Sequence, residues 1–227
     1  TIDDYRREIN GGGLFVRDGI IEALGSEADL PDAADEIINI SDCVVLPGLV
    51  NTHHHFYQNL TRTVPAAQNA TLFQWLKTLY PIWAQMGPIE IRCATQLALS
   101  EMALAGTTCT SDHLYLFPNG VRLDDEIEAA HEIGLRLHAT RGAMSIGESD
   151  GGLPPDQLVE SESHILDDSL RLIQAYHDPK PGAMIRIGIA PCSPFSVSRE
   201  LMRDAALLAR DQKVMLHTHL AENEQDV

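Results

Sequence analysis

The chain has 227 residues, a length that favours one large domain or two small ones. With 44% hydrophobic and 22% charged residues, it has the composition of a globular protein with a sizeable core. Sixteen lysine and arginine residues stand against 33 aspartate and glutamate residues, and the net charge of −17 argues against a nucleic-acid polymer or an anionic membrane as partner. A small neutral molecule fits this charge better.

The cysteines and the hydropathy pattern predict the compartment. The four cysteines are scattered without a Cys-x-x-Cys spacing, which is typical of a reducing environment. No charged and then apolar leader is seen at Thr1, and no apolar run approaches the ~18 residues of a membrane span. We therefore expect a cytoplasmic protein that does not contact a membrane, although a chain that opens in mid-pattern could have lost a leader.

The first forty residues have a β character of their own. An Asp18-Gly19 pair separates two β-prone runs in 14–24, which predicts a hairpin. Residues 26–36 are acidic and rich in proline and alanine, which indicates a loop, and 36–40 reads as a further strand. We expect residues 1–46 to be part of a small β domain and 47–227 to form the main domain.

The first strand of the main domain leads into three histidines. The apolar run 44–51 ends at His53, His54 and His55. Because side chains alternate along a strand, His53 and His55 share one face and His54 points the other way. Two imidazoles on one face are a natural pair of ligands for a metal that prefers nitrogen. The alternative is that one or two of them are ordinary polar residues of a strand-to-loop junction.

Strands and helices then alternate to the end of the chain. We expect helices at 71–86, 88–105, 124–134, 165–176 and 198–210, and strands at 107–112, 135–141, 185–190 and 214–219. With polar residues gathered at strand ends, this order predicts a parallel α/β barrel with its site at the carboxyl rim. The acidic runs 124–126 and 167–168 are expected to be solvated helix starts.

The last predicted strand carries a second histidine pair. His217 and His219 share a face, and Glu222 lies just past the strand end. Two strands that end in histidine pairs indicate one metal ion approached from two sides, with a carboxylate beside it for proton transfer. For His217, which lies one layer deeper, the alternative is a hydrogen-bonded histidine of the core.

These motifs resemble a known family. The segment 46–55 resembles the Pro-Gly-then-His-x-His signature of the amidohydrolase superfamily, and 219–222 resembles the His-x-x-Glu of its aminohydrolase and chlorohydrolase (ATZ/TRZ-like) branch. Closer similarities at 56–62, 73–76 and 111–115 are to the 8-oxoguanine deaminase group, once labelled hydroxyatrazine aminohydrolases.

The resemblance carries expectations about the fold. It implies a (β/α)8 TIM barrel of the metal-dependent hydrolase type, with a small flanking β-sandwich made from both chain ends. About five of the eight barrel strands fall in this chain. A sixth-strand histidine and an eighth-strand aspartate would lie beyond Val227, so that the chain would be a piece of an enzyme. The family also implies a homo-oligomer.

The resemblance also assigns roles at the site. His53, His55 and His219 match the family's metal ligands, and Glu222 matches the residue that passes a proton to the substrate ring. The cofactor would be one divalent ion, with Zn²⁺ first and Fe²⁺ as the alternative.

Five further residues are candidates for substrate binding. Gln58 suits a lactam edge, or else a loop hydrogen bond. Trp75 would stack on a planar ring, or else belong to the core. Arg141 would meet a carbonyl oxygen, or else form a salt bridge. His113 ends its strand at the rim, and Cys192 stands where related nucleoside deaminases have a histidine, a departure that favours a free base.

The expected activity is therefore hydrolytic deamination of a purine-like heterocyclic base. Conversion of 8-oxoguanine to urate and ammonia comes first, with guanine or isocytosine as other substrates. An s-triazine aminohydrolase or chlorohydrolase is an alternative within the same chemistry. A non-catalytic barrel is the alternative of another class, although such a scaffold usually loses the metal histidines that this chain retains.

Overall fold

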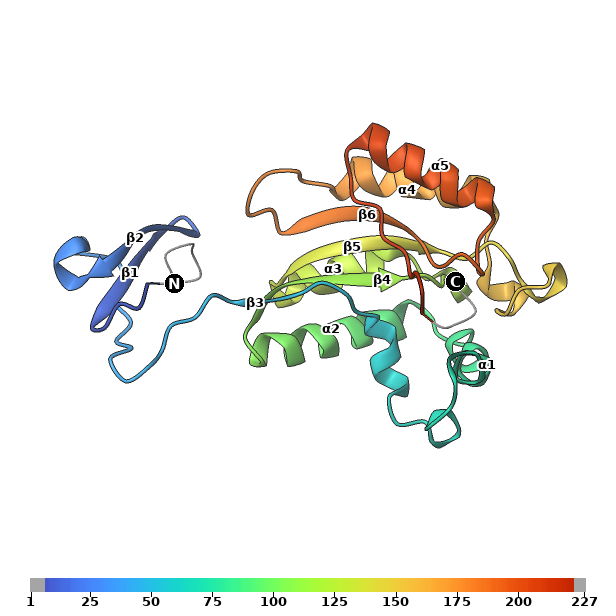
Figure 1. Cartoon of the computed structure of the whole chain (residues 1–227), viewed down its shortest axis with the longest axis horizontal. Coiled ribbons are helices and arrows are strands. Elements are labelled where there is room, and N and C mark those ends of the chain that lie inside the picture. Colours follow the sequence, from blue (N-terminus) through green and yellow to red (C-terminus); the bar gives the residue numbers. More distant parts are fainter. Residues whose placement is uncertain (1–6, 223–227) are drawn as a thin grey trace. The chain divides into compact units, whose positions relative to one another are not determined.

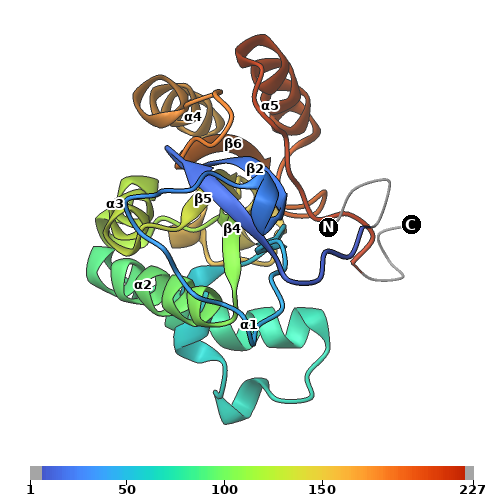
Figure 2. The ribbon, with the colours of Figure 1, turned by 90° about the vertical axis from the view of Figure 1, so that its left-hand side faces the viewer.

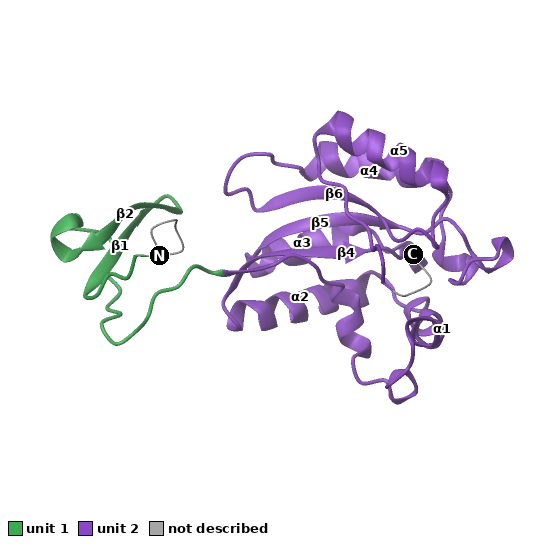
Figure 3. Cartoon of the chain, viewed as in Figure 1, with its two compact units in different colours: residues 1–48 green, residues 49–227 purple. Residues whose placement is uncertain are grey.

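The computed structural model describes residues 7–222, and the chain forms two compact units, residues 1–48 and 49–227 (Figure 3). In the first unit, β1 (Gly12–Arg17) and β2 (Ile20–Ser26) form an antiparallel hairpin with a bulge between Phe15 and Val16. Asp18 and Gly19 both have positive φ, of 50° and 76°, as a tight hairpin turn requires. The predicted hairpin is confirmed.

The strand predicted at 36–40 is wrong. Within the described part of the first unit, the hairpin is the only sheet, and Ile37 and Ile38 are 80% and 72% exposed. Apolar residues form a strand only where a second backbone offers hydrogen bonds, and here none does. The described residues of this unit therefore contain one hairpin and no further strand.

The second unit is an α/β layer structure. Its sheet has the order β3-β4-β5-β6, and every neighbouring pair is parallel. The strands are β3 (Leu49–Asn51), β4 (Thr107–Leu114), β5 (Arg136–Ala143) and β6 (Ile185–Pro191). Strands that are neighbours in the sequence are also neighbours in the sheet, which is the order of a barrel wall. The predicted parallel α/β architecture is confirmed.

Helices connect the strands and cover one face of the sheet, in an arc that Figure 2 shows from one end. They are α2 (Pro88–Leu104), α3 (Leu123–Ile133), α4 (Glu162–Tyr176) and α5 (Arg199–Gln212). Their ends follow local chemistry: α2 begins at a proline and α3 ends at Gly134 with φ 80°. On α2, Leu97 is 39% exposed, whereas Leu99 is fully buried.

Helix α1 (Leu72–Trp83) lies beside the carboxyl ends of the strands (Figure 1). It is shorter than the predicted 71–86. The fully buried Trp83 anchors it, donating from Nε1 to Thr61 Oγ1 at 3.0 Å and packing edge-on against Tyr57. Within residues 7–222 no helix has the length and apolar character needed to cross a bilayer.

The last predicted strand is present only as a single bridge. Leu216 pairs in parallel with Ile189 of β6, and His217 N–H donates to Ile189 O at 2.9 Å. His219 N–H donates to Cys192 O, also at 2.9 Å. The segment therefore runs along β6 where a fifth strand was expected, but its pairing is too sparse for a full strand.

The acidic runs are solvated only in part, which corrects the prediction: Asp167 is exposed, but the run 167–168 lies inside α4, and three other carboxylates are engaged by neighbouring elements. Glu126 is 1% exposed, Asp124 binds Arg171 in a bidentate pair, and Asp168 binds Arg141. These carboxylates face neighbouring elements of the layer, a fact that a local charge pattern does not reveal.

Strands β4 and β5 approach each other closely at Gly142. A Cβ atom at this position would overlap the carbonyl oxygen of Leu114 and the backbone and side chain of Tyr115. Only a glycine allows the two strands to pair at this point, next to the rim of the sheet.

Candidate metal centre

Histidines from three segments meet at the carboxyl edge of the sheet. His53 and His55 follow β3, His113 belongs to β4, and His217 and His219 lie along the end of β6. The group follows from topology, because the carboxyl ends of parallel strands open on the same edge.

Three of these histidines, His53, His55 and His219, form the predicted ligand set. One ligand nitrogen of each lies within 4.8 Å of the others. His55 Nε2 and His219 Nε2 are 3.1 Å apart, close to the separation of two nitrogens that share one tetrahedral ion at ~2.0–2.1 Å. The structure therefore brings together the residues that were expected to hold a metal.

The opposite nitrogens of these three rings are already engaged. His55 Nδ1–H donates to His113 O at 2.7 Å, and His219 Nδ1–H donates to Cys192 O at 2.7 Å. A carbonyl can only accept, so both rings carry a proton on Nδ1, and in the neutral form of each ring the lone pair is on Nε2. Such partners orient metal-binding histidines and fix their tautomers.

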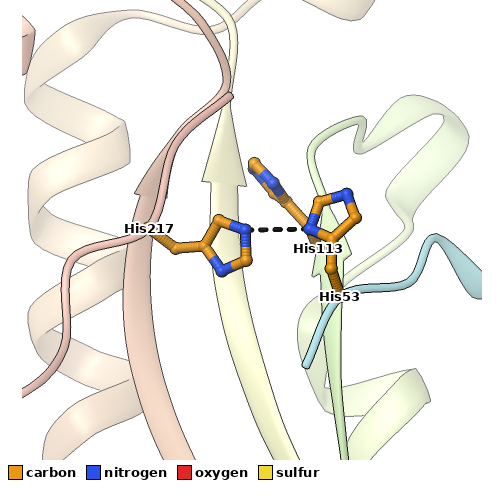
Figure 4. A group of neighbouring side chains, drawn as sticks. All are labelled: His53, His113 and His217. Atoms are coloured by element: carbon orange, nitrogen blue, oxygen red, sulfur yellow. Dashed lines mark hydrogen bonds between the residues drawn. The ribbon is translucent and has the colours of Figure 1, made fainter. Parts of the chain in front are cut away.

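His53 has a different partner. Its Nδ1 lies 2.9 Å from His217 Nε2, and Figure 4 shows the two rings beside His113. In the tautomer that leaves Nε2 of His53 free for a metal, Nδ1–H donates to His217. The sequence left His217 open between the metal group and a hydrogen-bonded core histidine, and its same-face spacing with His219 was the signal for a place in the group.

Burial keeps two of the candidate ligands, His53 and His55, neutral. It lowers the pKa of His55 to about 3, and burial, followed by repulsion from His219 and His217, lowers the pKa of His53 to about 4. A neutral imidazole is the form that binds metal. The low pKa values of these two rings, the hydrogen-bonded Nδ1 atoms and the close approach of one nitrogen from each ring together fit a divalent ion that prefers nitrogen.

His113 lies at the centre of the group. It is fully buried, its Nε2–H donates to Ala190 O at 3.1 Å, and its Nδ1 has no partner among the described residues. Its ring stacks on His219 at 4.7 Å between centroids. It therefore presents a bare lone pair inside the cluster.

Gln58 and Trp75 lie at different distances from the histidines. Gln58 Nε2 donates to Tyr57 OH at 3.3 Å, and the Tyr57 ring is 6.1 Å from that of His55. Trp75 packs edge-on against Trp83 at 5.2 Å and is partly buried against the core. The structure thus places Gln58 next to the cluster and Trp75 behind Trp83.

Cys192 and Glu222 lie on the His219 side of the cluster. Cys192 Sγ is 3.8 Å from His219 Nδ1, and burial raises the pKa of this thiol to about 12, with the Glu222 charge adding to the shift. Glu222 also raises the pKa of Tyr80, after the larger effect of burial. A left-handed φ of 57° at Ala221 turns the chain between His219 and Glu222. The carboxylate is therefore near the expected ligands.

Arg141 is engaged elsewhere. Its guanidinium forms a bidentate pair with Glu160 at 2.8 and 2.9 Å, binds Asp168 at 2.9 Å and covers the Phe117 ring at 3.8 Å. With a 1% exposed side chain, it faces α4 and the preceding loop. The structure therefore does not bring Arg141 together with the histidines.

Comparison with known proteins gives this site its family. Residues 44–227 match the model of the Amidohydrolase family, a stretch that contains all five clustered histidines. The chain belongs to the amidohydrolase family. Among amidohydrolases, the 8-oxoguanine deaminase of Pseudomonas aeruginosa is 51% identical over 214 residues, which are 93% of this chain and 48% of that protein.

Two further similar proteins have names that refer to atrazine or a derivative of it. Hydroxydechloroatrazine ethylaminohydrolase of Pseudomonas sp. strain ADP is 36% identical over 95% of this chain and 48% of its own length. The zinc complex of atrazine chlorohydrolase from Arthrobacter aurescens TC1 superposes with a TM-score of 0.89 at 32% identity, over 97% of this chain and 50% of that one. This amidohydrolase chain thus spans about half the length of the relatives it matches.

Proposed function

We propose that this chain carries the metal-binding part of an aminohydrolase that deaminates a purine-like free base, with 8-oxoguanine as the first substrate. The observation that carries the proposal is the convergence of His53, His55 and His219, whose Nδ1 atoms are each engaged by a hydrogen-bond partner. The 51% identity to an 8-oxoguanine deaminase supports the choice of substrate.

The chain's own residues would divide the work. His53, His55 and His219 would hold one Zn²⁺ ion, which supplies a Lewis acid that activates water near neutral pH. Glu222 would transfer a proton to the ring nitrogen next to the carbon that bears the amino group, because one group must both donate and accept there. Gln58 would pair with the lactam edge of the base, and His113 Nδ1 would accept a hydrogen bond from the substrate or from water.

The remaining expected contacts have weaker support. Cys192 lies against His219 and would limit the space beside the base, which favours a free base over a nucleoside. Trp75 would contribute only indirectly, because it packs against Trp83, which in turn packs against Tyr57. For Arg141, the ion pairs with Glu160 and Asp168 favour a structural role.

The parallel sheet belongs, in this proposal, to a (β/α)8 barrel. Support comes from the strand order β3-β4-β5-β6 and from the superposition on half of the triazine hydrolase chain. A homo-oligomer of the full-length protein in the cytoplasm remains our expectation from the family resemblance.

An s-triazine amino- or chlorohydrolase is the second candidate, favoured by the triazine relatives. One experiment separates the two. The full-length protein, loaded with zinc, is incubated with 8-oxoguanine, guanine, isocytosine and amino- or chloro-s-triazines, and the release of ammonia or chloride is followed. We expect the highest kcat/KM for 8-oxoguanine. Preferential turnover of a triazine would replace the proposal, and no release from any base would favour a non-catalytic scaffold.

A further inference from the structure

A buried pair of carboxyl groups lies directly behind the histidine segment. Asp112 of β4 and Glu126 of α3 are each 1% exposed, and each carboxyl group affects the ionisation of the other. One oxygen of each, Asp112 Oδ2 and Glu126 Oε1, is buried and accepts no hydrogen bond from an N–H or O–H of the described residues. Two ionised carboxylates have no donor between them, so a hydrogen bond between them requires a proton on one. None of the roles proposed above uses this pair.

The position of that proton follows from the other partner of Asp112. Asp112 Oδ1 accepts the backbone N–H of Phe56 at 2.7 Å, a contact suited to an ionised oxygen. Glu126 then holds the proton and donates it to Asp112. Burial raises the pKa of both groups, and the charge of Asp112 raises that of Glu126 further, which agrees with a proton held on Glu126.

No cation in the described residues replaces this proton. Within 4.0 Å of Asp112 the described residues place only one basic side chain, His54, whose Nδ1 is 3.9 Å from Asp112 Oδ1 and therefore too far for a hydrogen bond. The pair therefore keeps one carboxylate in the interior at a cost that two apolar residues would avoid. An apolar pair could not accept the N–H of Phe56.

The contact at Phe56 has a direct bearing on the site. Phe56 follows His55 and begins the 3-10 helix Phe56–Thr61, which carries Gln58. One residue further along β4, His113 N–H donates to His54 O at 2.8 Å. Strand β4 thus holds the histidine segment at two backbone groups, the carbonyl of His54 and the N–H of Phe56. Only the contact with Phe56 depends on a side chain.

We propose that Asp112 and Glu126 are positioning residues, in which a proton on Glu126 keeps the Asp112 carboxylate bonded to Phe56 and so fixes His55 and Gln58. This inference rests on the proposed metal site. It assigns the pair a role in metal and substrate binding as well as in stability. If the hydrogen bond to Phe56 is lost, both His55 and the side-chain amide of Gln58 become free to leave their positions.

The test compares Glu126→Gln with Glu126→Leu in the full-length protein. Glutamine keeps a donor toward Asp112, whereas leucine has similar bulk and no donor. Ile127→Ala, at the fully buried neighbour on α3, is the control for a general loss of packing. The readouts are Co²⁺ affinity by chelator competition, the Co²⁺ absorption spectrum, and hydrogen–deuterium exchange of residues 54–58 in the metal-free protein.

We expect Glu126→Gln to keep the Co²⁺ affinity within about threefold of wild type. Glu126→Leu should weaken it by about 10–100-fold, as losses of outer-sphere partners do, and should speed exchange at Phe56. Ile127→Ala should lower stability and leave the affinity of the folded protein unchanged. Equal affinity and exchange in the Leu variant and wild type would overturn the inference.

Two further outcomes keep the test decisive. If Glu126→Leu does not fold, Glu126→Gln decides alone, and a tenfold or larger loss of affinity despite its intact donor would contradict the proposal. A protein that deaminates no base but shows the expected exchange and Co²⁺ pattern would refute the proposed function and leave this inference standing.

Discussion

The close approach of one nitrogen from each of the three candidate ligands gives a prediction for single residues. His55→Ala or His219→Ala removes one of a small set of ligands, so we expect the purified protein to lose most of its metal and its turnover. His54→Ala is the matched control, because this neighbour faces Asp112 and not the cluster. Full metal occupancy in both ligand variants, measured by elemental analysis, would defeat the assignment.

His217 permits a finer prediction. Because His53 Nδ1 lies 2.9 Å from its Nε2, we expect His217→Leu to weaken metal affinity by about 10–100-fold without abolishing it. His217→Gln offers an oxygen that can accept from Nδ1–H and should recover most of the loss. Chelator competition measures both variants. Identical affinities for Leu and Gln would show that the ring contact does not orient His53.

Glu222 separates chemistry from binding. Glu222→Gln keeps the size of the side chain and removes the exchangeable acid, so kcat should fall by about 10²–10⁴ while metal content stays near that of wild type. KM for the base should change only modestly. A variant that loses its metal, with turnover restored by added zinc, would make Glu222 a ligand instead.

For single residues, the sequence predicts the direction of a side chain well where alternation along the chain alone decides it. His53 and His55 share a face and His54 does not, as alternation on a strand requires. Alternation gives no information on ring rotation or tautomer, so the contact of His217 with His53 remained hidden. Glu126 was misread because an acidic helix start is usually solvated, and its burial depends on β4.

Among the elements, the link between β5 and α4 has the largest expected energetic effect. Arg141→Met would leave Glu160, 17% exposed, without its bidentate partner and Asp168, 16% exposed, with Arg171 alone, so we expect a loss of about 3 kcal/mol, at the low end for a broken buried pair. Arg141→Lys should recover only part of it, because an ammonium cannot form the bidentate pair. Denaturant titration of the full-length protein gives the difference.

The control for this prediction is an exposed pair of the same type. Arg62 and Glu101 are bonded at 2.9 Å with side chains 53% and 46% exposed, so Arg62→Met should cost less than about 1 kcal/mol. A similar loss of unfolding free energy in the two variants would show that the buried ion pairs of Arg141 stabilise the protein no more than an exposed pair does. A raised KM in a folded Arg141→Met protein would instead support the substrate contact expected from the sequence.

The helices were easier to predict than the strands, for a physical reason. A helix satisfies its own backbone, and local signals such as Gly87-Pro88, Ser198 and Gly134 set its ends. A strand depends on a partner elsewhere in the chain. The apolar runs at 36–40 and 214–219 were therefore overpredicted, one having no partner and the other a single bridge.

For the molecule as a whole, His113 gives a prediction about stability in acid. Burial, then repulsion from His55, His219 and His217, holds its pKa well below the usual value. An unfolded chain takes up this proton near pH 6.5, whereas the folded protein does not. His113 thus contributes stability above pH 6.5 that is lost as the pH falls toward its folded pKa.

The comparison of wild type with His113→Gln isolates this effect in the metal-free protein. Between about pH 6 and pH 4.5, the free energy of unfolding of wild type should fall more steeply, by about 1.4 kcal/mol per pH unit for one proton. Denaturant midpoints at several pH values give the slopes. Parallel curves would show that His113 takes up its proton in the folded state.

The architecture was predictable because alternation of strand and helix patterns leaves few arrangements. A parallel sheet with helices on one face and a polar group at its carboxyl edge follows from that order. The hairpin at Asp18-Gly19 followed from turn chemistry alone. What the sequence could not supply is the pairing across distant segments, such as Asp112 with Phe56.

The close approach of β4 and β5 at Gly142 has a consequence for how this protein can evolve. Every missense change at a glycine codon adds a Cβ atom, and here that atom would overlap Leu114 O and Tyr115. No mutational step away from glycine is then open without parting two strands that hold His113 and Tyr115. Functional relatives that keep this strand pairing should all have glycine at this position, whatever ring they have come to accept.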